Sequence, residues 1–280
     1  MPEQLDLLAG FSRPQAEPQT AATPLPAPPA VEPEAKADQH EDAPKASPTT
    51  LLIIDTETSG LDPQQDQCLE LGCILFDVPS RSVLAQQSFL LPVDSNAAEP
   101  INRIPAAVTR RPQPWREALV WFEHLLDAAD LLVAHNAAFD RQWFGLGVVP
   151  ATATPWLCTM DDIRWPAERQ LRLRPSVRDL ALAYGVPVWA AHRALSDCIY
   201  IAEVFARCDD LEHLLERGLE PRQLMRARVS FDERHLAKAA GFRWNDPIKG
   251  AWTRRLSARE VAELEFPVAP VELEADRLSA

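Results

Sequence analysis

The sequence predicts an α/β fold, in which a mixed sheet is flanked by helices, with a disordered N-terminal tail and a small C-terminal helix-hairpin element. Two observations lead to this. Three apolar segments separated by turn residues are followed by alternating helical and strand patterns, and this order is typical of a mixed sheet. The 280 residues are 46% hydrophobic, enough for one medium domain with appendages.

The N-terminal segment 12–48 is rich in Pro, Ala and acidic residues and poor in side chains that form a core. Such a composition predicts a disordered, fairly extended linker. We therefore expect the main domain to begin at residue 49 and to extend to about residue 210.

The main domain contains the regular elements. Apolar runs bounded by turn residues predict four strands, at 50–56, 69–77, 83–91 and 131–134. Helical spacing and capping signals predict four helices, at 114–128, from about Ala137, from Ser176 to Gly185, and from about Ala191 to Arg207.

Charge is distributed unevenly along the chain, whose formal net charge is −13. Residues 1–48 carry −5, residues 49–220 carry −10, residues 221–259 carry +7 and residues 260–280 carry −5. A basic block inside an acidic protein fits a metal-binding domain beside a phosphate-facing element, although a solvated helix face gives the same count.

Cysteine usage and hydropathy indicate a cytoplasmic protein with no membrane segment. The five cysteines form no C-x-x-C pair and show no zinc-type spacing, so we expect reduced thiols. No run of about 18 apolar residues is present, and the start MPEQLDLL lacks the regions of a signal peptide.

Acidic residues recur where a catalytic site would need them. Asp55 and Glu57 end the first strand and, being two residues apart, point to the same side. Their charges repel, and a bound cation is the simplest way to offset that repulsion. Asp140 lies about one turn into the helix after strand 131–134, and His192 and Asp197 open the last helix.

Four carboxylates are the oxygen ligands that Mg²⁺ or Mn²⁺ prefers. Two such ions, about 3.5–4 Å apart, can clamp the attacking and leaving oxygens of a phosphodiester. A nearby histidine can take the proton from the attacking water. Singly, each acid could be an exposed charge and His192 an ordinary histidine, but the joint pattern favours a metal site with a general base.

The segments DTETSGL, HNAAFD and HRALSD resemble, in order and spacing, the three exonuclease motifs of the DEDDh 3′–5′ exonucleases. This family includes the proofreading epsilon subunit of bacterial DNA polymerase III, RNase T and oligoribonuclease. The resemblance covers about residues 49–208. It implies an RNase H-like fold, metal-dependent release of nucleotides from a 3′ end, metal binding by Asp55, Glu57, Asp140 and Asp197, and a general-base role for His192.

The resemblance also implies roles for neighbouring residues. Thr58, Gly60 and Leu61 are expected to hold the terminal nucleotide, with Leu61 wedged against its base. Glu70 either supports the site or is a plain buried or edge acid. His135 and Asn136 either order the site, with Asn136 contacting substrate, or cap the following helix, and we favour capping.

The basic element, residues 221–259, contains a capping box at Ser230 and Glu233, a helix that stops at Gly241, and a hairpin around DPIKG. Aromatic and Arg side chains suit stacking on unpaired bases and contacts with phosphates. The candidate nucleic-acid contacts are Arg243, Trp244, Lys249, Trp252, Arg254 and Arg255. The alternative is a hairpin whose tryptophans pack on its own helix. Both can hold together if the aromatic residues lie inside and Arg243, Lys249, Arg254 and Arg255 lie outside. Residues 260–280 read as an acidic tail.

The extreme N-terminus, residues 1–11, contains Gln4, Leu5, Leu7 and Leu8. The segment QLDLL looks like the short peptide by which bacterial replication and repair proteins bind the sliding clamp. The linker would reach roughly 35 Å as a coil and about 115 Å as polyproline helix.

Together these features predict a metal-dependent 3′–5′ exonuclease acting on single-stranded or frayed DNA. One alternative is an RNA 3′-end trimming enzyme with the same chemistry, because no motif reports on contacts to a 2′-hydroxyl. Another is a non-catalytic nucleic-acid adaptor, which the intact set of five residues disfavours.

Overall fold

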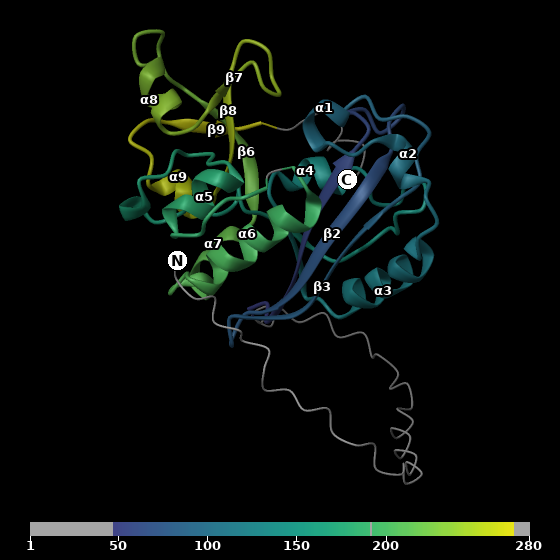
Figure 1. Ribbon diagram of the computed structural model, residues 1–280. Coiled ribbons are helices and arrows are strands. Elements are labelled where there is room, and N and C mark those ends of the chain that lie inside the picture. Colours follow the sequence, from purple (N-terminus) through teal and green to yellow (C-terminus); the bar gives the residue numbers. More distant parts are fainter. Residues whose placement is uncertain (1–46, 191, 272–280) are drawn as a thin grey trace, which may run out of the picture. The chain divides into compact units, whose positions relative to one another are not determined.

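The computed structural model describes residues 47–190 and 192–271, so the predictions for residues 1–11 and for residues 12–46 of the linker lie outside the described residues. A five-stranded sheet in the order β3-β2-β1-β4-β5 forms the centre (Figure 1). Its strands are β1 (Thr50–Thr58), β2 (Cys68–Asp77), β3 (Ser82–Leu90), β4 (Leu131–Ala134) and β5 (Trp156–Cys158). Strand β1 is antiparallel to β2 and parallel to β4. This mixed, RNase H-like sheet confirms the predicted fold class.

Both faces of the sheet are covered, which explains the four consecutive apolar residues that begin at Leu51. Leu51 and Ile53 pack in a core with helices α5 (Val177–Ala183), α6 (Ala194–Ala206) and α7 (Leu211–Gly218). Leu52 and Ile54 belong to the core of the opposite face, with helix α3 (Trp115–Asp127). Because side chains alternate along a strand, Asp55 and Glu57 continue the face that α6 covers.

The remaining helices match the predictions in part. Helix α5 begins with the predicted capping box, in which Ser176 and Asp179 bond each other's backbone N–H groups. Helix α4 (Ala137–Arg141) begins where expected, whereas α6 begins at Ala194 rather than Ala191. The sequence patterns missed β5, α7, the 3₁₀ turn η1 (Ala167–Arg169) and the short helices α1 (Glu99–Asn102) and α2 (Ala106–Thr109).

A second sheet, in the order β7-β8-β6-β9, follows the main domain. It consists of β6 (Arg222–Ala227), β7 (Arg243–Trp244), β8 (Trp252–Ser257) and β9 (Val268–Pro270), with helices α8 (Arg234–Ala239) and α9 (Ala258–Ala262). The predicted hairpin is confirmed, with Trp244 opposite Trp252. The structure differs from the expected boundary at residue 259, because α9 and β9 place residues 260–271 in this element rather than in an acidic tail.

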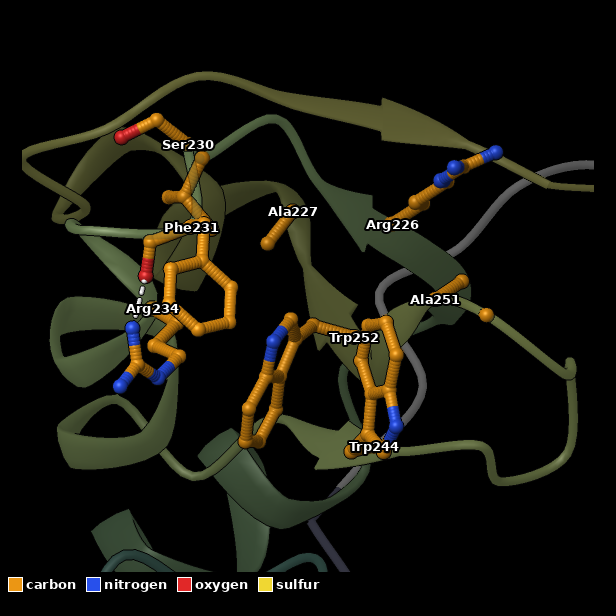
Figure 2. Close-up of a pocket in the computed structure, with 10 residues that line it drawn as sticks. Arg226, Ala227, Ser230, Phe231, Arg234, Trp244, Ala251 and Trp252 are labelled. Atoms are coloured by element: carbon orange, nitrogen blue, oxygen red, sulfur yellow. Dashed lines mark hydrogen bonds between the residues drawn. The ribbon is translucent and has the colours of Figure 1, made fainter.

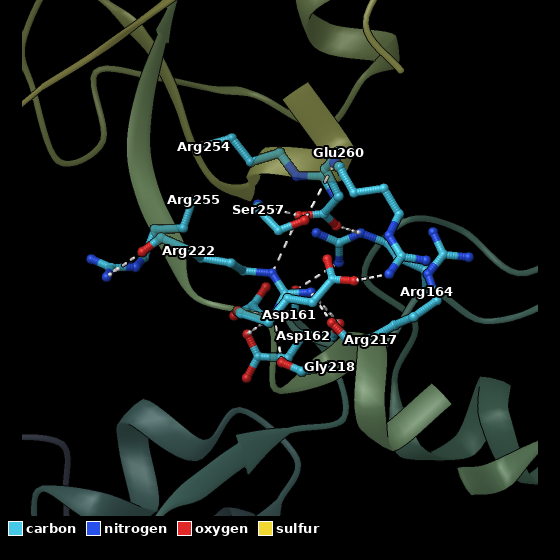
Figure 3. Close-up of polar contacts among 12 residues, drawn as sticks. Asp161, Asp162, Arg164, Arg217, Gly218, Arg222, Arg254, Arg255, Ser257 and Glu260 are labelled. Atoms are coloured by element: carbon cyan, nitrogen blue, oxygen red, sulfur yellow. Dashed lines mark hydrogen bonds and ion pairs between the residues drawn. The ribbon is translucent and has the colours of Figure 1, made fainter. Parts of the chain in front are cut away.

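A buried ionic cluster joins the second sheet to the main domain (Figure 3). The Arg222 guanidinium donates to the carbonyls of Gly218 and Arg217, to that of Asp162 at 3.0 Å, and to Glu260 Oε2 at 3.2 Å. Glu260 is also paired with Arg164, whose Nε lies 2.6 Å from Oε1. Removing one member of such a cluster leaves a buried charge without a partner, so the cluster ties the two parts together.

All five cysteines are free and buried. Among residues 47–190 and 192–271, none of the helices has the length and apolar composition needed to cross a bilayer.

Candidate active site

Three carboxylates meet between the sheet and α6. Asp55 and Glu57 come from the end of β1, and Asp197 comes from the first turn of α6. One oxygen of each carboxylate lies within 4.8 Å of the oxygens of the other two. Oxygen atoms this close can share one divalent cation, so the described fold brings together three of the four predicted acids in a geometry that fits a metal ion.

Gly72 allows α6 to approach the sheet closely enough to deliver Asp197. Gly72 lies directly opposite Asp55 in the β1–β2 pairing. A Cβ atom on Gly72 would lie 2.5 Å from the backbone C of Ala194 and the backbone N of Leu195. Only glycine therefore permits this contact between β2 and the start of α6.

The three carboxyl groups hold their protons unusually tightly. Burial, followed by the charges of Asp140 and Asp197, raises the pKa of Asp55 well above its ordinary value. Burial and the neighbouring Glu70 raise the pKa of Glu57 to about 8, and burial raises the pKa of Asp197. A bound divalent cation would offset the repulsion among these neighbouring carboxylates, so the donor set fits a metal ion.

Asp140, the fourth predicted acid, lies beside this cluster in the first turn of α4 and is buried. Its Oδ1 accepts hydrogen bonds from Thr56 N at 2.9 Å and Thr56 Oγ1 at 2.8 Å. Burial raises the pKa of Asp140 to about 7, against the opposing effect of these two bonds. The Thr56 contact was missed by sequence analysis, although Thr56 stands between two of the predicted ligands.

His192 lies at the exposed edge of the same cluster. Its backbone N–H donates to Asp197 Oδ2 at 3.1 Å, which ties the position of His192 to that of the acid. Its φ of 62° places it in the left-handed region, which a non-glycine residue adopts at a cost. The imidazole is exposed, and within the described residues it forms no hydrogen bond.

Glu70 supports the beginning of α6 and is buried. It accepts hydrogen bonds from Arg193 Nε and Nη2, from Ala194 N and from Ser88 Oγ, at 3.0, 2.9, 3.2 and 2.9 Å. Of the two predicted alternatives, these contacts favour a supporting residue. Sequence analysis did not assign a role to Arg193. Its position directly after His192 in the third motif was the one signal that it could support the site.

The expected nucleotide-binding residues occupy the end of β1 and the loop after it. The Thr58 hydroxyl donates to the Gly60 carbonyl at 2.6 Å, and the Thr58 carbonyl accepts from Asn102 Nδ2. A Cβ atom on Gly60 would lie 2.3 Å from the Asp66 carboxylate, so a larger residue there would displace the Asp66 side chain. Leu61 is 80% exposed. A large apolar side chain displayed in this way is available to contact a base.

The favoured capping role of His135 and Asn136 is wrong. Asn136 occupies the N-cap position of α4, but its side chain makes no capping hydrogen bond and is exposed. Its φ of 67° explains the choice of Asn, which tolerates the left-handed region. His135 Nδ1 lies 2.9 Å from Thr159 Oγ1, and burial lowers the pKa of His135 to about 4. His135 therefore links β4 to the segment after β5.

The residues of the second sheet that were predicted to contact nucleic acid differ in how far their side chains are exposed to solvent. Phe242 is buried, whereas Trp244 is 51% exposed, which contradicts the alternative in which the tryptophans pack inside. Arg254 is half-buried and donates to the Ala240 carbonyl, so it does not take the outward position of that alternative. Arg243, Lys249 and Arg255 are exposed, although Arg243 pairs with Asp246.

Two family models match the chain. One, described as an exonuclease, matches residues 52–205, and the other, described as a domain of unknown function, matches residues 223–271. The two matches coincide with the two sheets.

Similar proteins include replication enzymes. The chain is 28% identical over 162 residues to a PolC-type DNA polymerase III of Thermotoga maritima, covering 56% of this chain and only 12% of that protein. It is 30% identical over 160 residues to a DNA polymerase III subunit epsilon of Treponema pallidum, covering 54% of this chain and 73% of that protein.

Similar solved structures include two nucleases with bound DNA. Exonuclease X in complex with 5′ overhanging duplex DNA is 29% identical, with a TM-score of 0.45, over 60% of this chain and 99% of that one. E. coli exonuclease I in complex with a dA16 oligonucleotide is 16% identical, with a TM-score of 0.47, over 68% of this chain and 50% of that one.

Proposed function

The chain belongs to the DEDDh exonuclease family, and we propose that it is a metal-dependent 3′–5′ exonuclease that releases nucleoside monophosphates from single-stranded or frayed DNA. The observation that carries the proposal is the meeting of Asp55, Glu57 and Asp197 within 4.8 Å of one another. The names of its relatives, a polymerase epsilon subunit and a PolC-type polymerase, favour DNA over RNA as the substrate.

Asp55, Glu57 and Asp197, with Asp140 beside them, would hold Mg²⁺ or Mn²⁺. When bound, such ions neutralise phosphate oxygens and lower the pKa of a bound water. The three carboxylates must lose their protons to act as ligands, and a bound cation would favour their charged form against the burial that raises their pKa values.

His192 is the proposed general base. Its exposed imidazole lies on the segment that the backbone N–H ties to Asp197, so it can take a proton from a water held near the carboxylates. Leu61 would pack against the terminal base, and the Thr58–Gly60 turn and Asn136 would border the terminal nucleotide. Glu70 and Arg193 act through position, because they hold the beginning of α6 against β2.

Matched DNA and RNA oligonucleotides, each labelled at the 5′ end, test this proposal. Progressive shortening from the 3′ end, dependent on Mg²⁺ or Mn²⁺ and with mononucleotide products, is the expected result on DNA. Faster shortening of RNA would make the chain an RNA 3′-end trimmer, and products starting from the 5′ end would overturn the assigned direction. Asp197→Asn, which removes a ligand charge at nearly constant volume, is the control for contaminating nuclease.

The short sequence at Gln4, Leu5, Leu7 and Leu8 supports a further part of the proposal, which is binding to a bacterial sliding clamp. A tether of this kind would raise the local concentration of the nuclease near primer ends without new contacts to DNA. We also propose a cytoplasmic location, because bacterial replication, in which a sliding clamp acts, takes place in the cytoplasm.

A further inference from the structure

The second sheet carries an aromatic pocket that lies outside the carboxylate site. The pocket has a volume of about 480 Å³, and its lining includes Phe231, Trp244 and Trp252, with Arg226 and Arg234 (Figure 2). Phe231 comes from the segment before α8, Trp244 from β7 and Trp252 from β8. Residues from three separate segments thus converge on one hollow.

Two of these aromatic side chains, Phe231 and Trp244, are not explained by core packing. The core of the second sheet consists of Met225, Ala227, Ala237, Phe242 and Leu256, with Trp252 among the partly buried residues packed against it. Phe231 and Trp244 do not belong to that core and are 77% and 51% exposed. Large exposed aromatic residues around one hollow are typical of an interaction site.

The geometry of the rings suits a planar ligand. Trp244 and Trp252 face each other across the β7–β8 pair, with ring centroids 5.6 Å apart and planes inclined by 50°. The inclination means that neither indole covers the other face to face, and Figure 2 shows the Trp252 ring between the rings of Phe231 and Trp244. A flat aromatic group can therefore stack on an open ring face.

The charge around the pocket selects an anionic partner. The Arg234 guanidinium lies 3.8 Å from the centroid of the Phe231 ring, and Arg226 is exposed on β6. A neighbouring hollow shares Trp252 and Arg234 and adds His235, Lys238 and Asp232. Arginines beside the aromatic rings would repel a cationic ligand such as a quaternary ammonium, but they suit the phosphates of a nucleic-acid strand.

We infer that this pocket, defined by Phe231, Trp244 and Trp252, is a stacking site for unpaired bases of a single-stranded nucleic acid, whose phosphates are bound by Arg226, Arg234 and Lys238. The pocket would bind a part of the strand that lies outside the carboxylate site. Stacking on aromatic side chains together with phosphate contacts tolerates any base sequence. The inference rests on the proposed nuclease function for the identity of the strand. It assigns a role to the segment that matches a domain of unknown function.

Binding measured without hydrolysis separates this inference from the proposed catalysis. In EDTA, the full-length protein is titrated with a labelled oligothymidylate and with a matched oligouridylate, and anisotropy gives Kd at several salt concentrations. Trp244→Ala and Phe231→Ala should each weaken binding by about 5- to 100-fold. Arg234→Glu should weaken it and reduce the salt slope by about one or more. The two oligonucleotides distinguish DNA from RNA as the source of the bases.

Trp121→Ala is the matched control, because Trp121 is a 49% exposed tryptophan on α3 of the main domain. It should leave both Kd and kcat unchanged. Phe231→Ala serves as a second test because Phe231 lies outside the core, so its loss removes no core contact of the second sheet.

Unchanged Kd in both Phe231→Ala and Trp244→Ala would overturn the inference, even if the wild-type protein hydrolyses DNA. Conversely, absence of hydrolysis with normal, Trp244-dependent binding would refute the proposed catalysis and leave the pocket assignment standing. A peptide of residues 23–33, TPLPAPPAVEP, tests the other possible occupant. Trp244-dependent binding of this peptide, with no effect of Trp244→Ala on oligonucleotides, would show a proline-peptide site and overturn the inference.

Discussion

Glu70 and Arg193 are joined by two hydrogen bonds, in which Arg193 Nε and Nη2 donate to Glu70 Oε2 and Oε1 at 3.0 and 2.9 Å. The pair connects β2 to the residue that follows His192. Glu70 lies opposite Glu57 in the sheet, so Arg193 also offsets the repulsion between these two acids. One ion pair thereby positions the proposed base and moderates the charge at the proposed metal site.

The first prediction concerns this ion pair. The Glu70 side chain is 3% exposed and that of Arg193 is 49% exposed, so the two partners are unequal. Arg193→Ala leaves a buried charge with two remaining donors, Ser88 and Ala194, and should cost about 1–3 kcal/mol of the free energy of unfolding. Glu70→Gln should cost less, because Arg193 can turn to water. Urea unfolding measures both.

Both substitutions should lower kcat by up to about 10²-fold with little change in KM, because they displace His192 and Asp197 without removing a substrate contact. A double variant, Glu70→Gln with Arg193→Ala, should recover stability but not kcat. Wild-type kcat in the Arg193→Ala variant would show that the pair has no positioning role.

The second prediction concerns Gly72. Gly72→Ala forces α6 away from β2, because the new Cβ meets the backbone of Ala194 and Leu195. We expect the free energy of unfolding to fall by about 1–3 kcal/mol. Metal-dependent activity should also fall in the fraction that remains folded, since Asp197 moves with the helix. Gly147→Ala is the control, because no atom lies within 4 Å and only backbone strain is introduced. Equal specific activity of the two variants would contradict the proposed role of the close approach.

The third prediction concerns the pH dependence of stability. The pKa of Glu57 is raised from 4.5 to about 8, so the folded protein binds this proton more tightly than the unfolded chain. Its contribution to the free energy of unfolding is therefore lost progressively as pH rises from about 4.5 to about 8. Without metal, Tm should fall over this range, and Glu57→Gln should flatten the decline.

Divalent cations should act in the opposite direction. Mg²⁺ or Mn²⁺ binds the deprotonated carboxylates, so the increase in Tm on adding metal should be largest near the upper end of this pH range. Glu123→Gln, an exposed acid on α3, is the control and should behave as wild type. A metal-induced increase in Tm that is independent of pH and of Glu57 would place the ion elsewhere.

The fourth prediction concerns His192. His192→Ala should lower kcat by about 10²–10⁴-fold, the usual loss for a general base, because the proton of the attacking water then has no acceptor. The increase in Tm caused by Mn²⁺ should persist, since the carboxylates are intact. His213→Ala, an exposed histidine on α7, provides the control. A kcat within twofold of wild type would exclude His192 as the base.

The fifth prediction concerns the extreme N-terminus. A peptide of residues 1–12 should bind a bacterial sliding clamp with micromolar Kd, because a short linear motif buries little surface. Replacing Gln4, Leu7 and Leu8 with Ala should abolish binding in a fluorescence titration, with a scrambled peptide as the control. Failure to bind the clamp of the source organism at high peptide concentration would refute the motif.

Local pattern was sufficient for much of this fold. The apolar run at 51–54 predicted β1, because a strand covered on both faces must be apolar at every position, and the next acids fell on one face through simple alternation. Ser176 and Asp179 predicted a helix start through bonds between residues three apart. Such features depend on neighbours along the chain, so pattern alone is enough to predict them.

Other features depended on contacts between residues far apart in the chain. Glu70 and Arg193 are separated by 123 positions, and Thr56 and Asp140 by 84, so no local period reports them. The three-residue β5 is held by its pairing with β4 rather than by its own pattern. The inward position of Arg254 and the exposure of Trp244 follow from what packs against each face of the small second sheet, and those contacts are made by distant parts of the chain.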